Sequence, residues 1–348
     1  MGADDDGAPA QLPWLPLLPW QLDAARAALA QRSNWPHALL IYGPRGIGKH
    51  ALALNLAQAL LCEVATADGL ACGACPGCRY AQAGQHPDLL RLELLMLDPD
   101  DGTLEAVETI GIDRIRALTD FVQLTSHRQQ AKVAVIVPAE RMQAAAANAL
   151  LKTLEEPPPG TYLILVSDHP GRVPATILSR CRRLPAPLPT PVEAEAWLAG
   201  QGVARPDLAL ARAAGAPLTA LAHADPGVEA ERSAWIAAIA QPKGLSAAVL
   251  SARIEAGGRD QRKARLAQAL DWLIGWAADL ARVGAGDAPR QNPDAADALE
   301  RLARQVAPTA LFRYHRSLLH QRALLAHPLQ PRLVAEALLI DYLELVRR

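Results

Sequence analysis

Four of the five cysteines fall within one short segment, with the spacing C-x9-C-x2-C-x2-C. They are Cys62, Cys72, Cys75 and Cys78. Four thiolates can close a tetrahedral Zn²⁺ site with no open position, which is typical of a structural metal and not of a catalytic one. The two-residue spacings let a tight turn bring neighbouring sulfurs to one ion, and Gly73 and Gly77 permit such a turn. We therefore predict one structural zinc ion per chain.

Other uses of these thiols fit the sequence less well. An iron–sulfur run that opens with C-x2-C-x2-C continues with a fourth cysteine after three more residues, followed by a proline. Here that position is Gln82. A thioredoxin-like C-x-x-C pair would leave the other two cysteines without a role. In a reducing compartment, free clustered cysteines usually bind metal, so zinc is the preferred interpretation.

A second chemical motif lies just upstream, in the segment GPRGIGKH at residues 43–50. It matches the pattern G-x-x-x-x-G-K, in which glycines turn backbone N–H groups toward phosphates and the lysine reaches the β/γ oxygens. An apolar run precedes the loop, and a segment with helical spacing of apolar residues follows it, as the motif requires. The candidate nucleotide-binding residues are Gly43, Gly46, Gly48 and Lys49.

The same loop lacks both supports for magnesium. The residue after Lys49 is His50 where Ser or Thr is expected, and imidazole is a poor ligand for so hard a cation. The apolar run KVAVIV ends in Val137 and is followed by Pro138, where an ATPase needs a carboxylate. Glu140 lies three residues past that run, too far along the chain to substitute. We predict a loop that at most holds ATP or ADP and does not hydrolyse it.

The elements that must position these residues alternate over the first half of the chain. Strands are predicted at 37–42, 88–95, 132–137 and 161–167, and helices at 51–63, 110–122 and 142–156. Strands that alternate with helices predict an α/β fold, with a parallel sheet covered on both faces. The cysteine segment is then an insert between the first helix and the second strand.

The pattern changes at the proline-rich stretch 182–191, which is typical of a linker, and only helices are predicted after it. We predict three domains, namely a nucleotide-binding-like α/β domain at 1–187 with the zinc insert at 62–78, a small helical domain at 188–227, and a helical domain at 228–348. Trp272 and Trp276 lie four residues apart in the last of these, and we expect them on a buried helix face.

Composition excludes several classes of protein. The chain is 51% hydrophobic and 20% charged, as soluble globular proteins are. No apolar run reaches the roughly eighteen residues of a membrane span. The acidic start, MGADDDGAPAQLPW, has no apolar core of a signal peptide, so we expect a cytoplasmic protein. A net charge of -1 argues against a stand-alone nucleic-acid binder.

Taken together, HALLIYGPRGIGK, the four-cysteine insert, HPDLL, NALLKTLEEPP and TILSRC resemble the delta-prime subunits of the bacterial DNA polymerase III clamp loader. The resemblance is close over 37–185 and looser toward the C-terminus. It implies an AAA+ core, a small helical lid and a helical collar for oligomerisation. It also implies a pentamer with the delta subunit and three gamma or tau ATPase subunits, which opens the sliding clamp and loads it on primed DNA.

The resemblance further implies roles for single positions. Ser167 stands at the sensor position after the fourth strand. Arg180 is the arginine of the S-R-C motif, which in this family enters a neighbouring subunit's ATP site. A lid arginine completes the site in active ATPase relatives, and Leu218 occupies the matching place here. The resemblance thus implies an ATP-inert subunit, with no catalysis by the isolated chain. Glu155 and Glu156 end a helix before three prolines, where carboxylates oppose the helix dipole.

Two other functions stay open at this point. An autonomous AAA+ ATPase of DNA metabolism would hydrolyse ATP as an isolated chain. A zinc-dependent nucleic-acid module would use the cysteine segment for binding, but the net charge and the absence of aromatics interleaved with basic residues around the cysteines argue against it.

Overall fold

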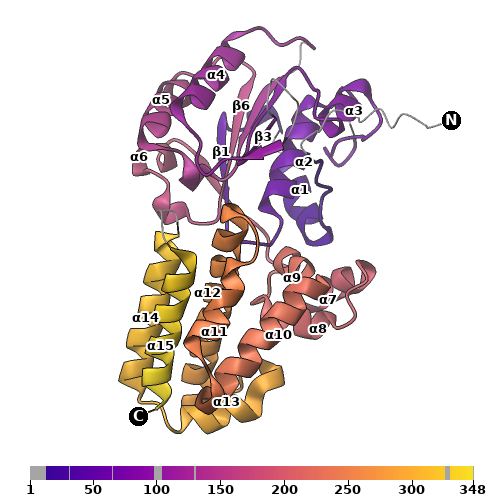
Figure 1. Cartoon of the computed structure of the whole chain (residues 1–348). Helices are drawn as coiled ribbons and strands as arrows, with labels where there is room; N and C mark the ends of the chain where they lie inside the picture. The colour runs from indigo at the N-terminus through magenta and orange to yellow at the C-terminus, as the bar shows by residue number, and fades with distance from the viewer. Residues whose placement is uncertain are drawn as a thin grey trace, which may run out of the picture. The chain divides into compact units, whose positions relative to one another are not determined.

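The structure is a computed structural model that describes residues 13–30, 32–64, 66–97, 104–128, 131–325 and 330–347. The acidic start of the chain, on which the expectation about a signal peptide rests, lies outside these residues. The chain divides into two compact units, Met1–Glu193 and Ala194–Arg348 (Figure 1). Each unit has its own hydrophobic core.

A parallel five-stranded sheet forms the centre of the first unit, in the order β2-β5-β6-β1-β7. Its strands are β1 (Ala38–Tyr42), β2 (Leu89–Leu92), β5 (Lys132–Ile136), β6 (Thr161–Ser167) and β7 (Arg182–Pro185). This confirms the predicted α/β fold. Tyr42 pairs with Ser167, so the loop that follows β1 begins beside the end of β6.

Helices cover both faces of this sheet, as Figure 1 shows. The helices of this unit are α1 (Leu22–Leu29), α2 (Lys49–Leu61), α3 (Pro76–Gln82), α4 (Ile112–Gln123), α5 (Ala144–Glu155) and α6 (Ala175–Leu178). Of these, α3 packs on α2. Successive strand residues point to opposite faces, so Ile41 packs with α1 and α2 while Leu40 packs with α4, α5 and α6. The three central strands, β5, β6 and β1, are largely apolar because both of their faces are buried.

Two strand predictions differ from the structure. Residues 182–185, assigned above to a linker, form the edge strand β7, whose side chains are mostly exposed. An exposed edge strand carries little apolar signal, and the prolines around it concealed the strand. The second predicted strand, 88–95, ends at Leu92, and a separate antiparallel pair follows, β3 (Leu95–Leu97) with β4 (Leu104–Ala106).

The second unit is all helical. Its helices are α7 (Pro191–Gly200), α8 (Pro206–Arg212), α9 (Pro217–His223), α10 (Pro226–Ala240), α11 (Ala247–Ala252), α12 (Arg259–Gly284), α13 (Ala296–Ala303), α14 (Pro308–Leu324) and α15 (Pro331–Val346). One small hydrophobic cluster joins α7, α8 and α9, and a larger one joins α10 to α15. Within the described ranges, no helix is both long enough and apolar enough to cross a membrane.

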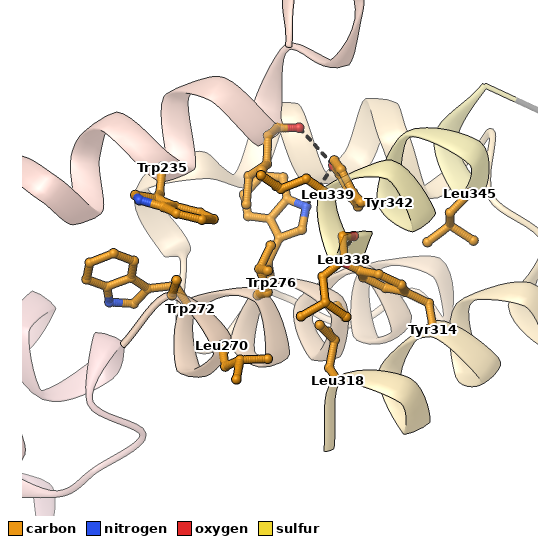
Figure 2. Packing of buried hydrophobic residues seen from close by; sticks show 14 of the residues in the cluster. Trp235, Leu270, Trp272, Trp276, Tyr314, Leu318, Leu338, Leu339, Tyr342 and Leu345 are labelled. Carbon is orange, nitrogen blue, oxygen red and sulfur yellow. Dashed lines mark hydrogen bonds between the residues drawn. The ribbon is translucent and has the colours of Figure 1, made fainter. Parts of the chain in front are cut away.

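The larger cluster is built around aromatic side chains (Figure 2). Trp272 and Trp276 are 7% and 0% exposed, which confirms the buried helix face predicted for them. The Trp276 indole donates to the Tyr342 hydroxyl at 3.0 Å, and that hydroxyl donates to the Ile239 carbonyl at 2.8 Å. One hydrogen-bonded chain therefore links α12, α15 and α10 inside an apolar core.

Candidate functional site

The glycine loop lies between β1 and α2, as the motif requires. Gly46 and Gly48 adopt φ of 80° and 91°, values that favour glycine. Gly48 has a second constraint, because a Cβ atom there would lie 2.2 Å from a methyl group of Leu18. The Gly43 amide donates to the Ser167 carbonyl at 3.3 Å. The loop is thereby held against the end of β6.

A segment ahead of α1 packs directly on this loop. The Trp20 indole donates to the Ile47 carbonyl at 3.0 Å, and the Gln21 amide donates to the Gly48 carbonyl at 2.7 Å. Trp20, Gln21 and Ile47 are all buried. Sequence reasoning missed Trp20 and Gln21, since nothing in their spacing links them to residues 26 or 27 positions away.

Lys49 does not point into open solvent. Its ammonium lies 2.6 Å from a carboxylate oxygen of Asp168 and 2.5 Å from the Pro44 carbonyl, and its side chain is 3% exposed. Asp168 directly follows Ser167, the predicted sensor residue, at the end of β6. The cation that should meet phosphate oxygens is therefore already neutralised by this chain's own carboxylate.

Two side chains fix the backbone around Asp168. The Asp168 amide donates to the Glu140 carboxylate at 3.0 Å, and the His169 amide donates to the Ser167 hydroxyl at 3.1 Å. The Ser167 hydroxyl thus accepts from its own loop, in a fully buried position. Glu140, which lies past the end of β5, supports the backbone of the residue that binds Lys49.

His50, which stands where the sequence predicts that a magnesium ligand is missing, belongs to an ion-pair cluster. His50 Nε2 lies 3.1 Å from a carboxylate oxygen of Glu93, and Arg91 Nε donates to the same oxygen at 2.6 Å. Burial by itself raises the pKa of Glu93, but His50 and Arg91 outweigh burial, so that pKa lies below its usual value. Glu93 is therefore a charged carboxylate whose oxygen is already engaged. Sequence reasoning missed it because it follows β2 and not β5.

The four predicted metal ligands come together. The sulfurs of Cys62, Cys72, Cys75 and Cys78 all lie within 4.8 Å of one another. Cys62–Cys75 and Cys72–Cys78 are each 3.9 Å apart, far longer than a disulfide. A tetrahedral zinc with bonds of about 2.3 Å places its sulfurs about 3.8 Å apart. The arrangement therefore fits a closed four-thiolate site.

Backbone groups around the sulfurs support the same chemistry. The amides of Cys72, Cys75 and Cys78 each donate to a cysteine sulfur, at 3.3, 3.3 and 3.4 Å. Hydrogen bonds from the Ala74 and Cys75 amides lower the pKa of Cys72 to about 6, while burial raises the pKa of Cys62 and of Cys78. N–H donors of this kind stabilise thiolates.

Helix ends hold the cysteine segment in place. Cys62 caps the end of α2, and Cys75 caps the start of α3. A Cβ atom on Gly77 would lie 2.8 Å from the Leu61 carbonyl, so the close approach of α3 to α2 requires glycine there. The fifth cysteine, Cys181, is buried in the other face of the sheet, and burial raises the pKa of its thiol to about 11.

Arg180 lies two residues after α6 and is 34% exposed at its side chain. Its guanidinium donates to a carboxylate oxygen of Glu155 at 2.5 Å and to the Thr176 carbonyl at 2.9 Å. Leu218 lies in α9, in the second unit. The predicted nucleotide-loop residues and Ser167 thus cluster at the ends of β1 and β6, while Arg180 stands apart with its own partner.

These features define a class of protein, a P-loop-type α/β domain whose loop lysine pairs with Asp168 and whose His50 pairs with Glu93, joined to an all-helical unit. Comparison with known proteins is more specific. Residues 24–188 match the family model described as DNA polymerase III, delta subunit, and residues 259–343 match the model described as DNA polymerase III, delta subunit, C terminal.

Named relatives agree with these matches. DNA polymerase III subunit delta' of Pseudomonas aeruginosa is 42% identical over 221 residues, which are 62% of this chain and 64% of that protein. DNA polymerase III subunit delta' of Escherichia coli is 34% identical over 286 residues, which are 81% of this chain and 80% of that protein. The chain belongs to the family of DNA polymerase III delta-prime subunits.

Among solved structures, a DNA polymerase III gamma subunit-related protein of Thermotoga maritima aligns with a TM-score of 0.46 and 18% identity, over 94% of this chain and 100% of that one. A likeness at this level carries no weight in the family assignment, which rests on the sequence relatives.

Proposed function

We propose that this chain is the catalytically silent delta-prime subunit of a DNA polymerase III clamp loader and supplies Arg180 in trans to a neighbouring subunit's ATP site. The observation that carries the proposal is the 2.6 Å ion pair between Lys49 and Asp168. A loop whose lysine is already paired with a carboxylate is a poor site for ATP. His50 and Glu93 pair with each other, where Mg²⁺ would be needed. The role that remains for this domain is to contribute a side chain to the ATP site of a neighbouring subunit.

The partners follow from the family. We propose assembly with the delta subunit and with gamma or tau ATPase subunits in a heteropentamer, which acts in the cytoplasm on the sliding clamp and on primed DNA. The chain reaches the clamp and the DNA through the complex, because its net charge of -1 provides no electrostatic footprint for nucleic acid.

The helical unit divides, in this proposal, into a lid at 188–227 and a collar at 228–348. Separate hydrophobic clusters support the division. Ala194, Leu198 and Leu210 belong to the smaller cluster, and the aromatic residues around Trp276 belong to the larger one. The lid would carry Leu218 in the place of a nucleotide-binding arginine, and the collar would hold subunits together.

We also propose one structural Zn²⁺ per chain, held by Cys62, Cys72, Cys75 and Cys78. A bound zinc would supply only a cross-link, since four thiolates leave no open position for water or substrate. The cysteines would cross-link the segment between α2 and α3 to the end of α2, beside a sheet domain that has its own core.

The test of the trans role is clamp loading by a complex reconstituted with Arg180→Ala. We expect folding and assembly to be retained and clamp-stimulated ATP turnover and loading to fall several-fold. An arginine that stabilises a phosphoryl-transfer transition state contributes about 10³ to 10⁵ at a single site, but other subunit interfaces keep their own arginines, so the total loss is smaller. Arg180→Lys should rescue poorly, because a point charge lacks the guanidinium fork.

Arg172→Ala is the matched control, because Arg172 is an exposed arginine on the neighbouring turn. Unchanged loading by the Arg180→Ala complex at saturating protein would contradict the proposal. ATP turnover by the isolated chain that Lys49→Ala abolishes would instead establish the alternative function, an autonomous AAA+ ATPase.

A further inference from the structure

Glu155 occupies an unfavourable place in the chain. It is the last residue of α5, and Glu156 and three prolines follow it. The C-terminal end of a helix carries partial negative charge, so a carboxylate there is disfavoured unless a cation compensates it. The cation is Arg180, whose Nη2 donates to Glu155 Oε1 at 2.5 Å.

Three contacts fix the Arg180 guanidinium. Besides Glu155, its Nη1 donates to the Thr176 carbonyl at 2.9 Å and to the Ser179 hydroxyl at 3.3 Å. A guanidinium has five N–H groups, and these contacts use three. The remaining two have no acceptor among the described residues, and the side chain stays 34% exposed. The contacts therefore fix the orientation of the group and leave donors for a phosphate oxygen.

We propose that Glu155 is a positioning residue for Arg180. The inference rests on the trans role proposed above. Arg180 has a long side chain that samples many rotamers when it is unrestrained, and an effective contact in a transition state needs placement within about 1 Å. A carboxylate that binds one edge of the guanidinium in advance removes much of that freedom. Glu155 acts on ATP hydrolysis only through Arg180.

The adjacent Glu156 is a control that the chain itself provides. It has the same charge, lies at the same helix end and is exposed, and its carboxylate has no hydrogen bond or ion pair to the described part of the chain. A change in turnover that comes merely from the net charge of this surface will appear equally with Glu156→Ala.

The experiment measures ATP turnover by complexes reconstituted with wild type, Glu155→Ala, Glu155→Gln, Glu156→Ala and Arg180→Ala chains. We expect Glu155→Ala to lower kcat about three- to tenfold, the effect of one lost charge-assisted hydrogen bond, with KM for ATP unchanged. Glu155→Gln keeps an acceptor oxygen and should retain more activity. Glu156→Ala should match wild type. In an Arg180→Ala chain, adding Glu155→Ala should cause no further loss.

The outcomes separate the two proposals. If Glu155→Ala has a normal kcat while Arg180→Ala has a lowered one, the positioning role of Glu155 is overturned. The trans role of Arg180 is then unaffected. A raised kcat for Glu155→Ala also overturns the positioning role, because the carboxylate then restrains Arg180. If Arg180→Ala changes nothing, both proposals fail. Assembly, checked by size-exclusion chromatography, must be equal for all variants, and loss of assembly by Glu155→Ala alone makes the residue structural and overturns its positioning role.

Discussion

Asp168 changes what the glycine loop can bind. The loop keeps the glycines and the lysine of a phosphate site, but the lysine lies 2.6 Å from Asp168 and its side chain is 3% exposed. A phosphate that enters must either displace this carboxylate or sit beside it, and like charges at such distances repel strongly. The proposed inertness would therefore have a cause inside the predicted phosphate site, besides the missing magnesium supports.

Asp168→Asn should accordingly increase affinity for ADP by about tenfold, since it removes a negative charge that faces the bound phosphates. The variant should also gain more thermal stability from ADP than wild type does, because phosphate then compensates the buried Lys49 charge. Isothermal titration and melting curves with and without ADP measure both effects. Hydrolysis should remain absent, because His50 and Glu93 are unchanged.

Asp120→Asn is the matched control, an exposed aspartate at the end of α4. An Asp168→Asn chain that binds ADP no better than the Asp120→Asn chain would show that the loop is closed by something other than the carboxylate, such as the Trp20 and Gln21 contacts.

At the scale of the elements, we expect the cysteine segment to be a local cross-link, and the fold of the α/β domain should not depend on it. The sheet buries Ile41, Val135 and Ile164 against α1 and α2 without any help from the cysteines. The proposed metal would thus organise only a short segment, in contrast to small zinc domains that unfold without their metal.

Metal analysis of the purified chain should give about one zinc per chain, lost when Cys72 and Cys75 are both changed to Ser. Circular dichroism should show nearly unchanged helix content, with damage limited to the residues around α3. Cys181→Ala is the control and should keep its zinc, because Cys181 lies in a different cluster. Iron with a visible charge-transfer band would overturn the zinc assignment.

Much of this arrangement could be predicted from sequence, and the failures have physical reasons. Local spacing identifies the glycine loop, because its chemistry depends on consecutive residues. The contact of Lys49 with Asp168 depends on β6 lying beside β1, and strand order is not a local property. Glu93 was missed for the same reason, since it reaches His50 from the end of β2. The edge strand β7 has too few buried side chains to show the alternation of apolar and polar residues that indicates a strand.

At the scale of the whole molecule, α14 and α15 present exposed apolar side chains. Phe312 and Leu319 lie seven residues apart on α14, and Leu333 and Ile340 lie seven apart on α15, with exposed fractions from 45% to 64%. Residues seven apart occupy one side of a helix. Each helix thus carries an exposed apolar stripe, as the collar of an oligomer needs.

Leu319→Ser combined with Ile340→Ser should weaken assembly with the partner subunits about tenfold or more, while the stability of the isolated chain changes little because both side chains already face solvent. Sedimentation of reconstituted mixtures and thermal melts of the single chain provide the two measurements. Val192→Ser, at another exposed apolar position, should assemble normally. If the double variant assembles as well as wild type, these stripes are not part of the subunit interface.

The hydrogen bond from Tyr342 to the Ile239 carbonyl has a consequence for how the protein is made. It joins positions 103 residues apart, and Trp276, which lies between them in the sequence, donates to the same hydroxyl. During synthesis, α10 and α12 emerge long before α15, so their tryptophans have no complete core to enter. Until α15 leaves the ribosome, the growing chain exposes an apolar aromatic surface. Translation pauses shortly before α15 should therefore promote aggregation, whereas pauses after β7, when the sheet is already complete, should be harmless.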